Sequence, residues 1–371
     1  MTDPRASVLA KNLVNFSCNV QKGENVLIEA TGIPNMLVKE LIKAVYERGG
    51  FPFVQLNDQQ ISRELLMNTS EEHCRRWADF AAYRMKDMHC YIALRGGGNM
   101  FESGDVPSEQ NKHYSTIYMN KVHMEIRLSK KWVVLRYPTP SMAQSAGMST
   151  EAFEDFYFKV CNLDYSKMDK AMDSLVAVLD KTDKVRIVSP GTDLEFSVKG
   201  IPSVKCAGTC NIPDGELYTA PVKNSVNGVI AYNTPSLYRG LKFDNVRLEF
   251  KDGKIVKESC NGLNKEITEI LNSDEGARFV GEFAIGVNPY INRAVLDTLF
   301  DEKIAGSIHF TPGNAYDNAD NGNRSSVHWD LILIQTKECG GGEIYFDGKL
   351  VRKDGIFVTK ELLCLNPENL K

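Results

Sequence analysis

Hydrophobic and polar positions in the first half of the chain follow two alternating periods, which predicts strands followed by helices. Residues 24–30 form a short apolar run that ends at a Thr-Gly-Ile-Pro turn. Residues 35–48 then carry apolar side chains at helical spacing. The same pattern predicts further strands at 51–56, 90–94 and 132–137, and further helices at 70–88 and 109–128. Strands that alternate with helices predict an open, mostly parallel sheet with helices on its faces.

The pattern changes near residue 182, after two predicted helices within residues 149–181. Strand-like segments then follow one another, and several are joined by Gly-containing turns. These segments are 184–188, 194–198, 246–250, 254–259, 331–335, 343–346 and 356–359. We therefore expect an α/β N-terminal domain over residues 1–181 and a β-rich α+β C-terminal domain over residues 182–371.

Length and composition suit a globular protein of two domains and exclude several other classes. The 371 residues exceed the size at which one hydrophobic core usually stops growing. The net charge of -4 leaves no excess of basic residues, which argues against a nucleic-acid binder or a protein of anionic membranes. The polar N-terminus does not resemble a secretory signal, and no apolar run reaches the roughly 20 residues that span a bilayer. The nine scattered cysteines are typical of reduced thiols, so we expect a cytoplasmic protein.

Two of the six histidines stand in settings that suit metal ligands. His328 and Asp330 are two residues apart where a predicted strand begins. Their side chains would therefore point to one face while Trp329 packs on the other. His309 ends an apolar stretch and enters a Gly-containing loop, which also carries Tyr316. This loop is well placed to face a cleft.

Two acidic residues are candidates for the same chemistry. Glu216 follows a Pro-Asp-Gly turn, which would present its carboxylate at the exit of the turn. Glu282 lies inside the apolar run 279–286, where a charge is costly unless it is paired or bound to a cation. Two imidazoles and three carboxylates form a mixed N/O set that suits Zn, Co, Mn or Mg. Five ligands match a pair of cations that share a carboxylate and a water better than one catalytic zinc.

Segments of the C-terminal half resemble the metallo-aminopeptidase family that contains bacterial aminopeptidases T and S. In order along the chain they are GTDL (191–194), NIPDGELYTAP (211–221), GEFAIGVNP (281–289), HFTPGNAY (309–316) and SSVHWD (325–330). The N-terminal half is similar to the family only in its α/β pattern. The metal ligands that this resemblance implies are Glu216, Glu282, His309, His328 and Asp330. It also implies that Glu282 bridges two divalent cations and that Tyr316 lines the same site.

The activity implied by this resemblance is hydrolysis of the N-terminal residue of peptides that have a free N-terminus. A water shared by two divalent cations would attack the scissile carbonyl, and Tyr316 would donate a hydrogen bond to the developing oxyanion. The carboxylate that would shuttle the proton is not identified by the sequence. The resemblance also implies a homodimer.

Two other interpretations remain open. His309, His328 and Asp330 alone form the 2-His-1-carboxylate set of non-haem Fe(II) oxygenases. A ring-cleaving dihydroxypyridine dioxygenase is similar to this peptidase family and would use such a subset. The presence of both Glu216 and Glu282 favours two metals over one iron. A non-catalytic binding protein that has kept the fold is the third interpretation, and the five intact candidate ligands argue against it.

Overall fold

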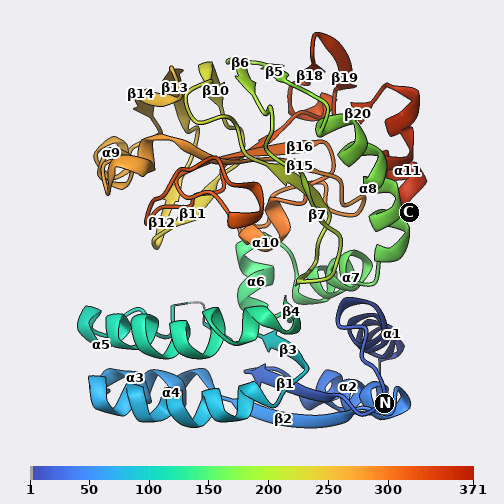
Figure 1. The fold of residues 1–371 in the computed structure, drawn as a ribbon, viewed down its shortest axis with the longest axis vertical. Helices are drawn as coiled ribbons and strands as arrows, with labels where there is room; N and C mark the ends of the chain where they lie inside the picture. The colour runs from blue at the N-terminus through green and yellow to red at the C-terminus, as the bar shows by residue number, and fades with distance from the viewer. Residues whose placement is uncertain (1–2, 100) are drawn as a thin grey trace. The chain divides into compact units, whose positions relative to one another are not determined.

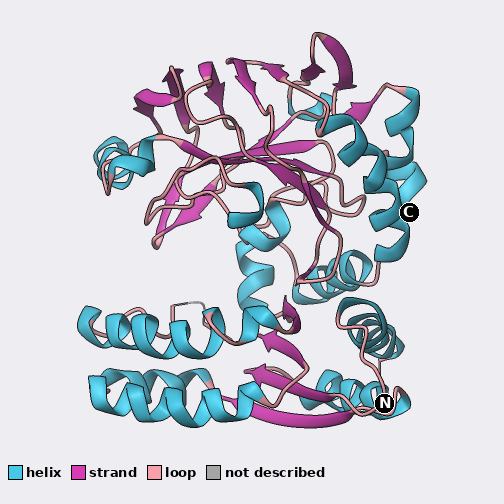
Figure 2. Cartoon of the chain, in the orientation of Figure 1, coloured by secondary structure: helices cyan, strands magenta, loops and turns pink. Residues whose placement is uncertain are grey.

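The chain folds into two compact units, whose helices and strands are labelled in Figure 1 and coloured by type in Figure 2. The computed structural model describes residues 3–99 and 101–371. The first unit extends to Asn162 and includes Gly208–Ile212. The second unit contains Leu163–Ala207 and Pro213–Lys371. The division therefore lies between Asn162 and Leu163, whereas the change in sequence pattern suggested residue 182.

The first unit carries the parallel sheet that the alternating pattern predicts. Its strand order is β2-β1-β3-β4-β8, and all neighbouring strands are parallel. The strands are β1 (Asn25–Thr31), β2 (Phe51–Asn57), β3 (Cys90–Arg95), β4 (Lys131–Arg136) and β8 (Asn211–Ile212). The helices are α1 (Pro4–Asn12), η1 (Leu13–Ser17), α2 (Asn35–Glu47), α3 (Gln59–Met67), α4 (Glu71–Lys86), α5 (Ser108–His113), η2 (Tyr114–Met124), η3 (Arg127–Ser129), α6 (Pro140–Ser145) and α7 (Thr150–Cys161). One face of the sheet packs on α4 and η2 through a core that includes Leu27, Ala78 and Tyr118.

The second unit is rich in antiparallel strands, as the hairpin pattern predicts. One sheet has the order β14-β13-β10-β6-β5-β18-β19-β20 and another has the order β17-β16-β15-β9-β7. The first of these contains β5 (Lys184–Ser189), β6 (Thr192–Ser197), β10 (Asn227–Ala231), β13 (Arg247–Lys251), β14 (Lys254–Ser259), β18 (Glu343–Phe346), β19 (Lys349–Lys353) and β20 (Ile356–Phe357). The second contains β7 (Val204–Cys206), β9 (Glu216–Thr219), β15 (Val280–Gly286), β16 (Ser307–Pro312) and β17 (Ile332–Ile334). We call the second of these the inner sheet.

A two-stranded ribbon and several helices complete the second unit. The ribbon pairs β11 (Ser236–Tyr238) with β12 (Leu241–Phe243). The helices are α8 (Tyr165–Leu179), α9 (Asn264–Leu271), η4 (Glu275–Arg278), α10 (Thr298–Asp301), η5 (Asp317–Ala319), η6 (Lys337–Cys339), η7 (Lys360–Leu365) and α11 (Pro367–Leu370).

A cluster of phenylalanines joins the two sheets of the second unit. Phe196 of β6 lies 5.0 Å, between ring centroids, from both Phe283 of β15 and Phe310 of β16. Because neighbouring residues on a strand point to opposite faces, Glu282 and His309 project from the other side of the inner sheet. The apolar face of this sheet is therefore used for packing, and the opposite face is left for polar side chains.

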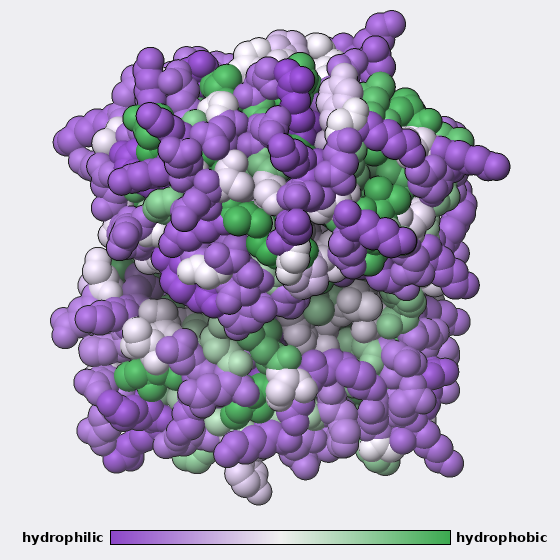
Figure 3. All heavy atoms as spheres, turned by 45° about the horizontal axis from the view of Figure 1, so that its top comes forward, coloured by the Kyte–Doolittle hydropathy of each residue, from purple (hydrophilic) through white to green (hydrophobic). Residues whose placement is uncertain are grey.

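Hydrophilic residues cover most of the face of the molecule drawn in Figure 3, with smaller apolar patches between them. Within residues 3–99 and 101–371, the structure has no helix that is both long enough and apolar enough to cross a membrane.

Trp329 anchors the segment between β16 and β17. It is buried, with 1% of its surface exposed. Its ring lies 4.8 Å from the rings of both Tyr238 and Phe243, and its indole N–H donates to Oγ of Ser236 at 2.9 Å. The β11–β12 ribbon therefore holds Trp329 on one side of the chain and leaves the flanking residues free to face the other.

We expect Trp329→Ala to lower the free energy of unfolding by about 3–5 kcal/mol, because a large buried ring leaves a cavity when it is removed. Trp329→Phe keeps most of the packing and loses the bond to Ser236, so we expect a smaller loss, about 1–2 kcal/mol. Urea unfolding followed by circular dichroism measures both. Equal destabilisation by the two variants would contradict this account of the packing.

Candidate metal centre

Three adjacent strands of the inner sheet bring three of the predicted ligands onto one face. Glu216 is the first residue of β9, Glu282 lies in β15 and His309 lies in β16. In the register of these strands Ala284 is opposite His309 and Gly286 is opposite Glu216. These two small residues leave space between the larger side chains on either side. His309 lies within a strand, so its predicted place at the end of one was wrong.

Two glycines of β15 allow other backbone segments to approach the site. A Cβ atom at Gly281 would lie 2.2 Å from the carbonyl oxygen of Asn314. A Cβ atom at Gly286 would lie 2.4 Å from the carbonyl oxygen of Ile304. The register with β16 also shifts between Val280 and Glu282, as at a β-bulge. Glycine is therefore required at both positions by close approach of the backbone.

His328 and Asp330 come from the extended segment that precedes β17. This strand begins at Ile332, and His328 forms an isolated bridge with Gly313. The pattern had suggested that the two side chains lie at the start of the strand, but they lie before it. They nevertheless share a face, because Nε2 of His328 is 3.4 Å from Oδ1 of Asp330. Trp329 is buried on the other side, as predicted.

Glu282 connects the two histidines. Its Oε1 lies 3.1 Å from Nε2 of His309, and its Oε2 lies 3.2 Å from Nε2 of His328. Oε2 of Glu216 is 3.6 Å from the same nitrogen of His309. The structure therefore brings all five predicted ligands together around one shared carboxylate.

Hydrogen bonds from outside the ligand set orient two of these residues. Nδ1 of His328 lies 2.9 Å from the carbonyl oxygen of Asn314. A carbonyl oxygen only accepts, so Nδ1 donates and Nε2 faces the carboxylates. Oδ1 of Asp330 accepts a hydrogen bond from the hydroxyl of Thr311 at 2.8 Å. Such outer partners fix the tautomer and orientation of metal-ligating side chains.

The carboxylates and imidazoles shift one another's pKa. Burial alone would lower the pKa of His309, but Glu216 and Glu282 raise it to about 10. Burial also opposes the charged form of His328, but Asp330 and Glu282 raise its pKa to about 11. Burial would raise the pKa of Glu282 and of Asp330, but the two histidines outweigh it and hold both below their usual values. The site therefore attracts positive charge, whether as protons on the imidazoles or as a cation.

The ligand atoms fall into two groups that fit divalent cations. The atoms of each group lie within 4.8 Å of one another, with Glu282, His328 and Asp330 in the first group and Glu216, Glu302 and His309 in the second. Oε2 of Glu216 and Nδ1 of His309 are buried, and neither has a hydrogen-bond partner in the described part of the chain. A buried carboxylate oxygen without a partner is costly, and a cation would satisfy it. Imidazole and carboxylate donors suit Zn, Co, Mn or Mg.

Tyr316 lies beside the first group. Its ring is 4.8 Å from the ring of His328 and 5.6 Å from that of Tyr218. The hydroxyl of Tyr218 donates to Oδ1 of Asn318, while Tyr316 remains about half exposed. Partial burial and the charge of Glu282 raise the pKa of Tyr316, so its hydroxyl stays protonated and can donate a hydrogen bond.

Sequence reasoning missed two residues at the site, Lys303 and Glu302. Nζ of Lys303 lies 2.5 Å from Oε1 of Glu216 and 2.5 Å from Oε1 of Glu302, and its side chain is 1% exposed. Burial alone would lower the pKa of Lys303, but the two carboxylates raise it, so the side chain is an ammonium. The available signal was the charged triplet at residues 301–303 just before an apolar stretch. Charged residues next to a buried strand are costly unless they pair with opposite charges.

Comparison with known proteins identifies the family. The model of the thermophilic metalloprotease (M29) family matches residues 2–355. Aminopeptidase 2 of Geobacillus stearothermophilus and aminopeptidase PepS of Streptococcus thermophilus are each 24% identical to this chain, over 93% of it and 94% of the relative. The solved structure of wild-type AmpT from Thermus thermophilus has the same fold, with a TM-score of 0.79 and 20% identity over 96% of this chain and 99% of that one. The resemblance found in the sequence is thus confirmed, and the chain belongs to the thermophilic metalloprotease family M29.

Proposed function

We propose that this chain is a metal-dependent aminopeptidase that removes the N-terminal residue of peptides, with two divalent cations held around Glu282. The observation that carries this proposal is the position of Glu282, whose two carboxylate oxygens face different imidazoles. Membership of a metalloprotease family supports it. The relatives that match over 93% of the chain are named aminopeptidases, which supports the substrate class.

The roles of the side chains follow from their charge and position. The chemistry that divalent cations supply in such a site is polarisation of the scissile carbonyl and activation of a water for attack on it. Glu216, Glu282 and Asp330 supply the negative charge that would balance the cations, and the imidazoles of His309 and His328 supply neutral donors once they lose their extra protons. The half-exposed hydroxyl of Tyr316 donates a hydrogen bond to the oxygen on which negative charge develops. We propose Zn, Co, Mn or Mg as the cations because the ligands are imidazoles and carboxylates.

The iron dioxygenase receives no support from the comparisons, whose matches are to a metalloprotease family and to named aminopeptidases. The geometry also favours the peptidase. Glu216 and Glu282 both lie within 4 Å of Nε2 of His309, so the site has more carboxylates than a 2-His-1-carboxylate centre uses.

A homodimer is the proposed assembly, and the first unit offers a surface for it. Strand β2 is the edge of its sheet and exposes Phe51 and Leu56. Helix α4 exposes Phe80 and Tyr83 by 79% and 84%. Exposed apolar side chains along a sheet edge favour association. We also propose a cytoplasmic location, because nine cysteines scattered along the chain are typical of a protein that keeps reduced thiols.

The first test of the function is removal of the cations and of one ligand. We expect excess chelator to abolish hydrolysis of aminoacyl-nitroanilides and added divalent cation to restore it. His328→Ala should lower kcat/KM by more than the ~10–100-fold typical of losing an outer hydrogen-bond partner, because a ligand itself is lost. His113→Ala, a half-buried histidine of the first unit, is the matched control. Full hydrolysis in the presence of chelator would reject the proposal.

The second test is the pH dependence of cation binding. The pKa values of about 10 for His309 and about 11 for His328 mean that both imidazoles carry an extra proton at neutral pH. Cations bind the neutral form, so binding should release about two protons per chain, and the affinity should rise with pH from 6 to 9. Calorimetry in buffers of different ionisation enthalpy measures the released protons. An affinity that does not change with pH would contradict these pKa shifts.

The third test concerns the assembly. Replacing Phe80 and Tyr83 together by aspartate should give a monomer in sedimentation velocity, because two charges would have to be buried in the contact. Leu363→Asp, at an exposed apolar position of the second unit, should leave the dimer intact. A wild-type protein that sediments as a monomer would remove the proposal of a dimer.

A further inference from the structure

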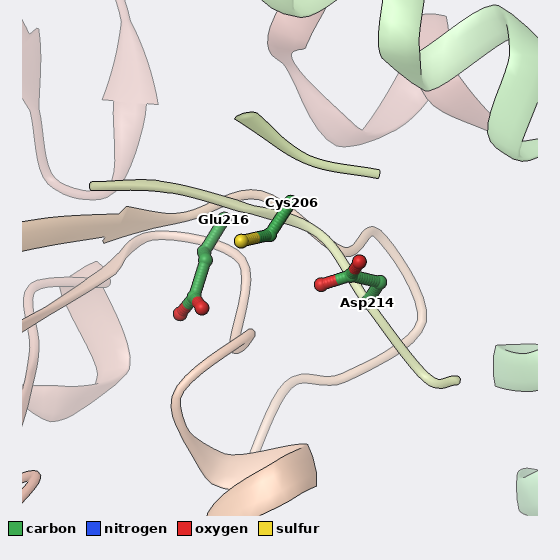
Figure 4. Close-up of side chains that lie close together, drawn as sticks. All are labelled: Cys206, Asp214 and Glu216. Carbon is green, nitrogen blue, oxygen red and sulfur yellow. The ribbon is translucent and has the colours of Figure 1, made fainter. Parts of the chain in front are cut away.

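A lysine ammonium is buried among acidic side chains next to the candidate metal centre. Figure 4 shows Cys206, Asp214 and Glu216 close together, and their ligand atoms lie within 4.8 Å of one another. Such a trio has the composition of a metal site. However, Nζ of Lys303 lies 2.5 Å from Oε1 of Glu216 and 3.7 Å from Oδ1 of Asp214. These acidic groups therefore already surround a positive charge that belongs to the chain.

The backbone fixes Lys303 in this position. The segment crosses the end of β15, where Gly286 has no side chain to obstruct it. The N–H of Asn288 donates to the carbonyl oxygen of Lys303 at 3.0 Å, and Asn288 also forms a bridge with Ile304. The backbone of Lys303 is thus anchored, and its side chain is 1% exposed. The ammonium is therefore held next to Glu216.

The two groups of candidate ligands differ in what supports them. In the first group, His328 is oriented by the carbonyl of Asn314, and Asp330 by the hydroxyl of Thr311. In the second group, Nδ1 of His309 is buried without a hydrogen-bond partner among the residues described. One oxygen of each carboxylate in that second group is taken by the ammonium of Lys303. A metal ligand without an outer partner, or one shared with another cation, binds less strongly.

Oε2 of Glu216 nevertheless points to a cation in the second group. This oxygen is buried, lacks a hydrogen-bond partner within the described residues, and lies 3.6 Å from Nε2 of His309. Lys303 holds only the other oxygen of that carboxylate. The second group is therefore able to accept a divalent cation, but against the repulsion of an ammonium that contacts two of its three ligands.

We propose that Lys303 makes the two cation positions unequal. The position formed by Glu282, His328 and Asp330 fills first and tightly, whereas the position formed by Glu216, Glu302 and His309 fills second and weakly. This proposal rests on the proposed function only in assuming that the site takes divalent cations. Its consequence is that the level of free cation sets occupancy of the second position, so that activity follows cation supply while the first position stays filled.

The experiment is a calorimetric titration of the metal-stripped full-length protein with Co²⁺ at neutral pH, with bound ions counted by elemental analysis. We expect two binding steps whose dissociation constants differ by about tenfold or more. Lys303→Met removes the charge and keeps the length of the side chain, so it should tighten the second step by about tenfold or more and leave the first unchanged. Lys303→Arg keeps the charge and should leave the two steps unequal.

The steps are assigned to positions by two further variants. His328→Ala should remove the tight step, and His309→Ala should remove the weak one. This assignment also tests the proposal if Lys303→Met does not fold, because loss of the tight step in His309→Ala would overturn it. Two equal steps in the wild type would also overturn it. A second binding step that weakens in a folded Lys303→Met protein would also overturn the proposal, because the lysine would then only orient Glu216.

These outcomes are separate from the test of the proposed activity. Two unequal steps in a protein that hydrolyses no peptide would reject the aminopeptidase and leave the role of Lys303 in place. Equal steps in an active, chelator-sensitive enzyme would reject the role of Lys303 and leave the aminopeptidase in place. Activity is therefore not used to judge the order of binding.

Discussion

Burial of negative charge is the constraint on which the second unit depends. Glu216 and Glu282 are 5% and 3% exposed, and Asp330 lies beside them. Carboxylates removed from water are tolerated only where positive charge or hydrogen-bond donors replace the lost hydration. Two imidazoles and one ammonium provide this replacement. The elements that bring these cationic groups to the carboxylates are therefore as necessary to the fold as they are to any chemistry at the site.

The inner sheet satisfies this constraint by giving its two faces different tasks. Phe283 and Phe310 pack against the neighbouring sheet, and the alternation of the strands turns Glu282 and His309 the other way. Irregular backbone segments cover the polar face. They can approach the strand only where it has no side chain in the way. Gly281 permits the approach of the carbonyl that orients His328. The apolar packing, the glycines and the ligand geometry thus form one connected arrangement.

The sequence predicts those features that depend on local pattern. The alternation of strands and helices identified the parallel sheet of the first unit, and the spacing of His328 and Asp330 predicted their common face, because both signals lie within a few residues. The limits of elements were less well predicted, since His309 lies inside β16 and β17 begins only at Ile332. Helix α3 was not predicted at all. Its start was nevertheless marked by Asp58, whose side chain accepts hydrogen bonds from the N–H groups of Gln60 and Ile61 and so caps the helix.

Contacts that depend on strand register could not be predicted from pattern alone. Lys303 is 87 residues from Glu216, and the two meet only because β9 pairs with β15 in one register and the chain crosses β15 at Gly286. A register one residue different would turn Glu216 to the opposite face. The family resemblance indicated the five candidate ligands without this information. It was silent on Lys303, which lies outside the matching segments.

A fixed ammonium has a physical advantage over an exchangeable ion beside Glu216. A site that relies on divalent cations alone leaves its carboxylates repelling one another whenever the cations are absent, and the fold is then destabilised by the amount that binding would have contributed. Lys303 neutralises part of this charge at all times, because it is attached to the chain and is ionised where it lies. The same charge opposes the entry of a second cation. Stability without metal and affinity for metal therefore cannot both be maximal at this position, and the contacts of Lys303 favour stability.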